Sequence, residues 1–226
     1  MADFINMKTK DGFMLSLYEA KPTGPAKAGI VILQEIFGVN KHIQEVCDHY
    51  ASKDFHVLAP CLFDRAETGI SLAYDDEGKE KGRIYKNKVQ DFAISDISDS
   101  LALFPQTLPK IVIGYCWGGS LAWHMACAHD GLAGAISYYG GELPSHQDKQ
   151  AKCPVQTHFG EQDATIPMDG VHDFIAAQPH HDHYIYDAGH GFNCDHRAQY
   201  NKEASQQAAS HVTLFLKKIL GETNSS

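Results

Sequence analysis

A glycine-rich corner within the stretch KIVIGYCWGGSLAWHMACA, residues 110–128, carries a residue suited to covalent chemistry. An apolar run typical of a strand ends there, Cys116 follows, and a helical pattern begins at once. Gly114, Cys116 and Gly118 match the pattern Gly-x-nucleophile-x-Gly. In that pattern a sharp strand-to-helix turn exposes the nucleophile, and the N–H groups of the helix favour negative charge. The spacing therefore predicts a thiol nucleophile at Cys116.

Two other interpretations fit a corner of this kind. It could bind a phosphate group, or Cys116 could be a small residue that only packs in the core. The corner contains neither Gly-x-Gly-x-x-Gly nor Gly-x-x-x-x-Gly-Lys-Ser/Thr, which leaves the phosphate interpretation weak.

A thiol nucleophile requires a base and a carboxylate that orients the base. Hydrolases with such a corner supply them in the chain order nucleophile, acid, histidine. Asp163 comes just after the apolar run PVQTHFG, and His190 lies in the glycine-flanked loop AGHGF. Because the carboxyl ends of parallel strands meet at one edge of a sheet, the three side chains could converge. Glu161 and Asp169 compete with Asp163 for the role of the acid.

A metal site is an alternative for the same region. His190, Cys194 and His196 are closely spaced, and Cys and His are common zinc ligands. No second ligand cluster of recognised spacing accompanies them, so we expect neither a metal nor a cofactor.

The rest of the sequence predicts the elements that position these residues. Apolar runs alternate with segments of helical periodicity, a pattern typical of an α/β fold with a doubly wound, mostly parallel sheet. The runs DFINM and FMLSLYEA flank an Asp-Gly corner and predict an N-terminal antiparallel hairpin. The polar stretch 64–88 predicts an excursion over the sheet ends. Helices are expected over roughly 40–53, 85–103, 118–129, 168–177 and 196–219.

Length and composition limit the classes of function. The 226 residues are 43% hydrophobic and 21% charged, which predicts one globular domain over residues 1–226. The formal charge of -9 comes with no cluster of five or more Lys and Arg, which argues against nucleic-acid binding. The chain has no run of 18 apolar residues and no export signal. We therefore expect a cytoplasmic protein, a monomer or homodimer without membrane contact, whose six cysteines are reduced.

Beyond these local patterns, the sequence resembles the dienelactone hydrolases (carboxymethylenebutenolidases), a thiol-using branch of the α/β-hydrolase fold. The resemblance covers nearly the whole chain. It is most specific in QEIFGVN, residues 34–40, and in GYCWGG, residues 114–119, and GEQDATIP and AGHGF support it. It implies an α/β-hydrolase fold for this chain.

The resemblance also implies roles for individual residues. Three form the catalytic set: Cys116 as the nucleophile, His190 as the general base and Asp163 as the carboxylate that orients it. Glu35 would lie against the thiol in the resting enzyme and take its proton when substrate binds. The backbone N–H groups of Ile36 and Trp117 would form the oxyanion hole.

Substrate recognition departs from the family pattern. The family's dienelactone enzymes hold the substrate carboxylate with two arginines, one before the long middle helix and one four residues after the catalytic histidine. Cys194 occupies the second position here, and Arg197 lies three residues further on. Lys81 or Arg83 could correspond to the first arginine.

The expected function is hydrolysis of a small-molecule lactone or carboxylic ester, dienelactone-like, through a cysteine acyl-enzyme with a Cys-His-Asp triad. One alternative is a general short-chain carboxylesterase that acts on uncharged esters. The other is a non-catalytic ligand-binding protein in which Cys116 is a redox-sensitive residue.

Overall fold

The computed structural model describes residues 2–222 and has an α/β fold with a mostly parallel sheet and an antiparallel N-terminal hairpin, as the sequence predicted. The chain divides into two compact units, Met1–Ile113 and Gly114–Ser226. The single domain over residues 1–226 stays a prediction. Among residues 2–222, no helix combines the length and the apolar character needed to cross a membrane.

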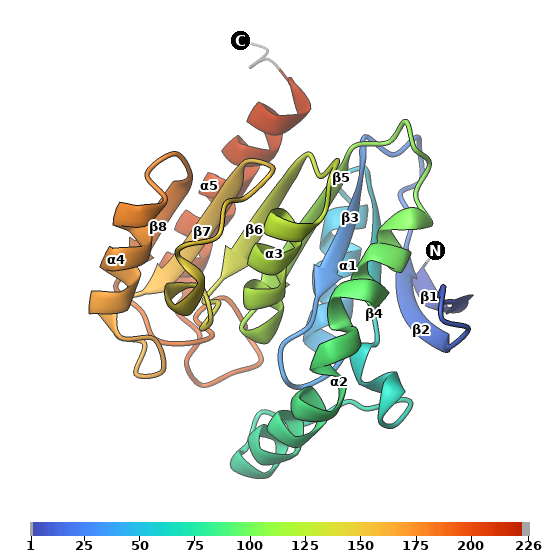
Figure 1. Ribbon diagram of the computed structural model, residues 1–226, viewed down its shortest axis with the longest axis horizontal. Helices are drawn as coiled ribbons and strands as arrows, with labels where there is room; N and C mark the ends of the chain where they lie inside the picture. Colours follow the sequence, from blue (N-terminus) through green and yellow to red (C-terminus); the bar gives the residue numbers. More distant parts are fainter. Residues whose placement is uncertain (1, 223–226) are drawn as a thin grey trace. The chain divides into compact units, whose positions relative to one another are not determined.

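The first unit contains the N-terminal hairpin and the start of the parallel sheet (Figure 1). Its strands are β1 (Ala2–Lys8), β2 (Met14–Ala20), β3 (Ala28–Leu33), β4 (Phe55–Pro60) and the first part of β5 (Lys110–Tyr115). The strands β1 and β2 pair antiparallel, β2 pairs antiparallel with β4, and β4 pairs parallel with β3. Gly12 makes the hairpin turn at φ +90°, a left-handed conformation that favours glycine.

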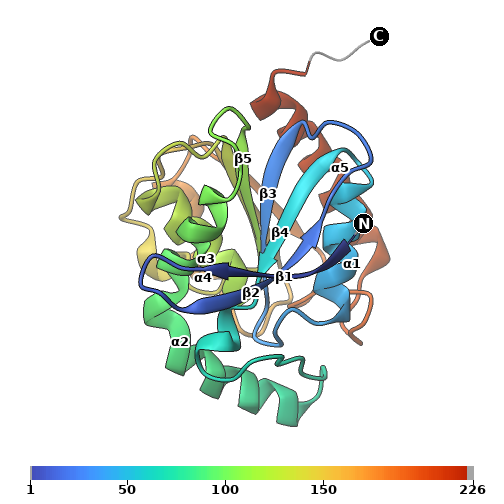
Figure 2. The ribbon, with the colours of Figure 1, turned by 90° about the vertical axis from the view of Figure 1, so that its right-hand side faces the viewer.

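Two helices cover the strands of the first unit from opposite sides (Figure 2). They are α1 (Lys41–Ala51) and α2 (Asp76–Ala102), and a 3₁₀ turn, η1 (Leu62–Arg65), precedes α2. The side chain of Asn40 accepts a hydrogen bond from the N–H of Ile43 and caps α1. The helix predicted over 40–53 is confirmed.

The long middle helix begins earlier than the sequence predicted. It was expected over 85–103, with an excursion over 64–88, but α2 starts at Asp76, so the second half of that excursion is helical. Asp75 accepts a hydrogen bond from the N–H of Gly78 at 2.7 Å and caps the helix. At Gly78 and Gly82 an added Cβ would lie within 2.0 Å of a backbone oxygen. This polar first half therefore packs through glycines, which leave no apolar periodicity to recognise.

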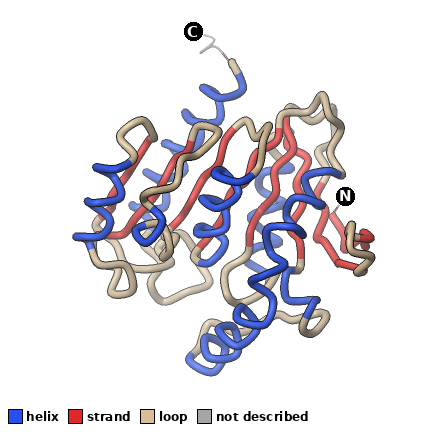
Figure 3. The backbone as a smooth tube through the Cα atoms, viewed as in Figure 1, coloured by secondary structure: helices blue, strands red, loops and turns tan. Residues whose placement is uncertain are grey.

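The second unit arranges its three strands between helices (Figures 1 and 3). The strands β6 (Gly134–Tyr138), β7 (Val155–Gly160) and β8 (Asp182–Tyr186) are parallel, with β7 in the middle. The helices α3 (Trp117–Ala128) and α4 (Met168–Ala177) lie on one side, and α5 (Lys202–Leu220) on the other. A 3₁₀ turn, η2 (Pro144–His146), follows β6.

The last helix begins later than the predicted residue 196. Successive turns occupy the intervening chain, where the N–H of Arg197 donates to Cys194 O and the N–H of Tyr200 donates to Arg197 O. Asn201 then caps α5 by accepting from the N–H of Ala204 at 3.1 Å.

The parallel strands of the second unit carry the segments that hold the candidate site residues. Every residue of β6 and β7 is buried, as expected for strands covered on both faces. Because β7 and β8 run parallel, the loops after their carboxyl ends open on the same edge. Asp163 lies in the first of these loops and His190 in the second.

Candidate active site

Cys116 alone separates the strand β5 from the helix α3. Its backbone has φ 54° and ψ −114°, in the left-handed half of conformational space that non-glycine residues rarely adopt. Conformations of this kind cost about 1–3 kcal/mol and persist only where the surroundings enforce them. The N–H of Cys116 donates to Tyr138 O at 3.0 Å, and the carbonyl of Cys116 accepts from the N–H of Ser120. The predicted sharp turn is therefore present.

Two glycines let the backbone turn this tightly. A Cβ added at Gly114 would lie 1.9 Å from the carbonyl oxygen of Gly118. A Cβ added at Gly119 would lie 2.5 Å from the carbonyl oxygen of Tyr138. Both distances are impossible for real atoms, so the glycines permit the backbone contacts that surround Cys116.

Asp163 and His190 meet as the sequence predicted. The Nδ1 atom of His190 lies 2.6 Å from Oδ2 of Asp163 and 3.1 Å from the hydroxyl of Thr165. The other carboxylate oxygen, Oδ1, accepts hydrogen bonds from the hydroxyl of Thr165 at 2.6 Å and from its N–H at 2.8 Å. A proton on Nδ1 satisfies these contacts, which assigns the tautomer whose Nε2 can accept a proton.

Burial strengthens the interaction between the two side chains. The Asp163 side chain is fully buried and that of His190 is 18% exposed. Burial raises the pKa of Asp163, but the interactions with His190 and Thr165 outweigh it, so the pKa lies below its usual value.

Burial and the neighbouring groups also act in opposite directions on the pKa of the His190 imidazole. Burial lowers the pKa of His190, but the charge and hydrogen bond of Cys116, together with Asp163, raise it above its usual range. Cys116 and Asp163 thus both favour the imidazolium form of His190. The three side chains form one connected set.

The other carboxylates that the sequence offered do not take part in this contact. Glu161 and Asp169 are both exposed, and Asp163 is the carboxylate hydrogen-bonded to His190. The zinc alternative also fails on geometry. Within residues 2–222, no group of three ligand atoms within 4.8 Å of one another contains His190 or Cys194.

Aromatic packing and an arginine surround the histidine loop. The ring of Tyr139, a residue with φ 39°, lies 5.1 Å from the ring of His190 and 5.5 Å from that of Phe192. Gly191 has φ +77°, and a Cβ there would lie 2.5 Å from a guanidinium nitrogen of Arg197. Arg197 therefore lies against the residue next to His190, although it occupies a different place in the loop from the family's arginine.

Glu35 follows β3 in the first unit and is 1% exposed. The hydroxyl of Tyr74, from the excursion, donates to its Oε2 at 2.9 Å. The next residue, Ile36, places its carbonyl oxygen where a Cβ on Gly82 would be only 1.9 Å away. The excursion and the start of α2 thus hold the loop that carries Glu35 and Ile36.

Two of the three basic residues considered for substrate binding lie on α2. Lys81 and Arg83 are both exposed, and Lys81 forms an ion pair with Glu77 at 2.7 Å. The sequence placed both residues in an irregular excursion, whereas the structure fixes them on a helix.

Sequence reasoning missed two residues that contact the predicted ones. Thr165 stands two residues after Asp163, and Asp is a recognisable turn residue because its side chain accepts a hydrogen bond from the backbone two residues on. Tyr74 had no comparable signal, because its contact with Glu35 spans 39 residues of chain.

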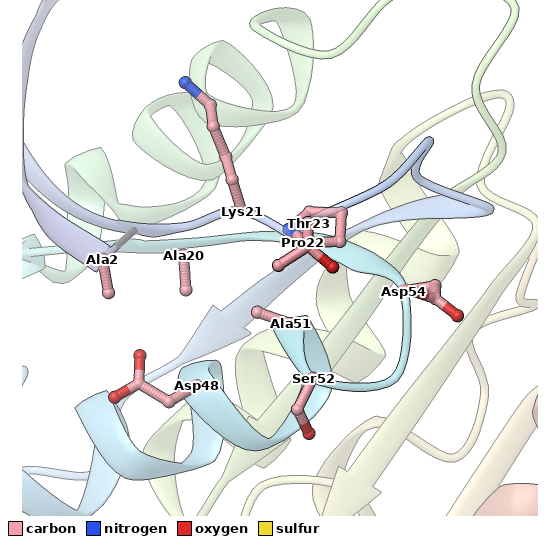
Figure 4. A pocket seen from close by; sticks show the side chains of 9 residues that line it. All are labelled: Ala2, Ala20, Lys21, Pro22, Thr23, Asp48, Ala51, Ser52 and Asp54. Atoms are coloured by element: carbon pink, nitrogen blue, oxygen red, sulfur yellow. The ribbon is translucent and has the colours of Figure 1, made fainter.

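A separate pocket in the first unit contains none of the predicted site residues (Figure 4). It has a volume of about 230 Å³ and lies between the end of β2 and the C-terminal part of α1. Lys21, Asp48 and Asp54 are its charged side chains, and the others are small. It pairs no nucleophile with a base.

Known proteins resemble this chain in sequence and in fold. A sequence model of the dienelactone hydrolase family matches residues 15–220. Two proteins named "Putative carboxymethylenebutenolidase" are each 32% identical over 86% of this chain. The match covers 88% of the protein from Synechocystis sp. and 80% of that from Yersinia pestis.

The solved structures agree in fold. The crystal structure of a "Putative Dienelactone Hydrolase" from Klebsiella pneumoniae matches with a TM-score of 0.79 and 21% identity over 99% of both chains. An esterase from Pyrococcus furiosus matches with a TM-score of 0.73 and 14% identity, over 96% of this chain and 91% of its own. The fold is therefore that of the α/β-hydrolases.

We expect Asp163→Asn to lower the pKa of His190, because an amide cannot supply the negative charge that stabilises the imidazolium. The measurement is an NMR titration of the ring nitrogens of His190. Thr165→Val is the matched control, since it removes the hydroxyl but keeps the carboxylate, and it should shift the pKa less. An unchanged titration in Asp163→Asn would contradict the electrostatic coupling.

The same pair makes stability depend on pH. The raised pKa of His190 contributes stability that is present below about pH 6.5 and lost as the pH rises through the folded-state pKa. The lowered pKa of Asp163 contributes stability that is present above about pH 3.9 and lost as the pH falls through its folded-state pKa. Urea unfolding should therefore separate wild type from Asp163→Asn most between about pH 4 and 6.5.

Proposed function

Because the chain belongs to the dienelactone hydrolase family and is a carboxylic ester hydrolase, we propose that it cleaves a lactone or ester through a cysteine acyl-enzyme. One observation carries this proposal. Cys116 stands at the strained corner before α3 and interacts with a histidine whose other ring nitrogen faces a buried carboxylate. This is the arrangement of a nucleophile, its base and the group that orients the base.

In the first half of the reaction the thiolate of Cys116 attacks the carbonyl carbon. A carbon–sulfur bond forms, and the carbonyl electron pair moves onto the oxygen. The N–H groups of Ile36 and Trp117 are proposed to stabilise this oxyanion, and Trp117 is the first residue of α3, where the helix dipole favours negative charge. The carbon–oxygen bond of the ester then breaks, and protonated His190 gives a proton to the departing oxygen.

In the second half, water replaces the sulfur. Neutral His190 takes a proton from the water through Nε2 as the oxygen attacks the thioester carbon. The carbon–sulfur bond breaks, the acid product leaves, and the thiolate is restored. Asp163 keeps the proton on Nδ1 throughout and stabilises the imidazolium, which gives up its Nε2 proton in the first half-reaction and is regenerated in the second.

Glu35 is proposed to accept the thiol proton when substrate binds, a role carried over from the family resemblance. Its burial and its hydrogen bond from Tyr74 support this role, because they hold a buried carboxylate in a fixed position. Glu35 would then control when the thiolate forms.

A general carboxylesterase for uncharged esters is the second candidate. Cys194, which is fully buried, occupies the position of one of the family's two carboxylate-binding arginines. A site with fewer cations would favour anionic substrates less.

Replacing Cys116 by alanine should abolish hydrolysis and leave the fold intact, because the side chain reacts rather than packs. Wild type should give a burst of p-nitrophenol from p-nitrophenyl acetate, and alkylation of Cys116 should remove it.

His190→Gln should lose at least about a hundredfold in kcat. Cys127→Ala, also on α3 but outside the set, should retain the burst. Near wild-type turnover by Cys116→Ala would refute the nucleophile, whereas the absence of turnover and of a burst in wild type would favour the ligand-binding alternative.

Glu35→Gln should raise the reactivity of the resting thiol and lower turnover. Removal of a nearby negative charge makes a thiolate easier to form, whereas glutamine cannot accept the proton on substrate binding. The measurement is the rate of Cys116 alkylation by iodoacetamide against pH, beside lactone turnover. Glu45→Gln, a half-exposed carboxylate on α1 that pairs with Lys41, is the control for the loss of charge. If alkylation and turnover both matched wild type, Glu35 would have no role in the reaction.

Anion recognition can be tested by comparing a lactone that carries a carboxylate with a neutral short-chain ester. We expect Arg83→Ala or Lys81→Ala to raise KM for the anionic lactone and leave KM for the neutral ester unchanged, because only the anion needs a cation. Arg197→Ala tests the third basic residue. Lys88→Ala, exposed on the same helix, is the control. Unchanged KM values in Arg83→Ala and Lys81→Ala would exclude α2 from the substrate site.

A further inference from the structure

Two histidines and a glutamate form a cluster in the second unit that the proposed reaction does not use. His124 belongs to α3, Glu142 to the loop after β6, and His146 to η2. One nitrogen or oxygen of each side chain lies within 4.8 Å of the other two. The Nε2 atom of His124 is 3.1 Å from Oε2 of Glu142, and the rings of His124 and His146 are 4.7 Å apart, inclined by 72°.

We propose that His124, Glu142 and His146 bind a divalent transition-metal ion of the zinc class. Zinc takes imidazole nitrogen and carboxylate oxygen at about 2.0–2.2 Å, so neighbouring ligand atoms in a tetrahedral site lie about 3.4 Å apart. The His124–Glu142 distance of 3.1 Å is close to that value, and a ligand atom of His146 lies within 4.8 Å of both, so binding requires only His146 to move closer. Calcium and magnesium prefer oxygen ligands, so two imidazoles favour zinc and its neighbours.

Hydrogen bonds hold the segments that carry Glu142 and His146 against α3, the helix that carries His124. The hydroxyl of Ser120, on α3, accepts a hydrogen bond from the N–H of Glu142 at 3.0 Å. The indole nitrogen of Trp123, also on α3, donates to the carbonyl oxygen of His146 at 3.2 Å. Ser120 and Trp123 are both buried. Fixed backbones reduce the ordering that metal binding requires.

The site has room for a fourth ligand and is distinct from Cys116. The side chains of His124 and Glu142 are 16% and 37% exposed, which admits a water molecule as the remaining ligand. His124 follows Cys116 by eight residues, which is about 12 Å along a helix axis. A metal ion held by the cluster would therefore join the loop after β6 to α3 and stabilise the folded chain.

The test measures Zn²⁺ binding to the full chain by isothermal titration calorimetry, after iodoacetamide has blocked the accessible thiols. Wild type should bind one Zn²⁺ ion at its highest-affinity site. Glu142→Gln and His146→Phe should each weaken that binding at least tenfold; the phenylalanine keeps a ring beside His124 but has no ligand atom. His172→Asn, an exposed histidine on α4, should bind as wild type does.

Thermal unfolding gives a second readout. At one fixed Zn²⁺ concentration, the rise in Tm should be the same for His172→Asn as for wild type and smaller for Glu142→Gln and His146→Phe. Circular dichroism spectra without metal establish that the variants fold. Equal Zn²⁺ affinity in wild type and both variants, or no binding by wild type, would overturn the proposal and leave the cluster as a hydrogen-bonded His–Glu pair with a neighbouring ring.

Discussion

The positive φ angle of Cys116 is the constraint on which the candidate site depends. A chain that passes from β5 to α3 through a single residue must bring backbone segments into contact that side chains would keep apart. Gly114 and Gly119 permit those contacts, and the carbonyl of Tyr138 holds the N–H of Cys116. The strain, about 1–3 kcal/mol, is balanced by hydrogen bonds that only this backbone can make. The same geometry presents the thiol at the first turn of α3.

The buried carboxylate of Asp163 requires hydrogen-bond partners, and the structure provides them. Asp163 has no exposed side-chain surface, and an isolated charge in that position would be strongly unfavourable. Thr165 supplies two hydrogen bonds from the next turn of the chain, and His190 supplies the third across the sheet edge. Because Asp163 is satisfied only while His190 faces it, the carboxylate determines the tautomer of the imidazole and so the nitrogen available for chemistry.

The helix α3 and the loop after β6 connect the two proposed sites. Cys116 precedes the first turn of α3, Ser120 lies one turn on, and His124 one turn further. Tyr138, the last residue of β6, supplies the carbonyl that holds Cys116, and the loop that follows supplies Glu142, which is anchored to Ser120. Close packing of β6 and the loop after it against α3 therefore positions both the corner at Cys116 and the proposed metal ligands.

The sequence by itself determined what depends on neighbouring residues and on strand order. It identified the hairpin, most helices, the corner at Cys116 and the meeting of Asp163 with His190, because glycine spacing and parallel strand ends are local or topological signals. Tertiary structure decided the rest. The polar start of α2 has no apolar stripe and packs through glycines, so its residues read as a loop. The contacts of Tyr74 with Glu35 and of His124 with Glu142 join residues far apart in the chain, and only the folded backbone brings such side chains together.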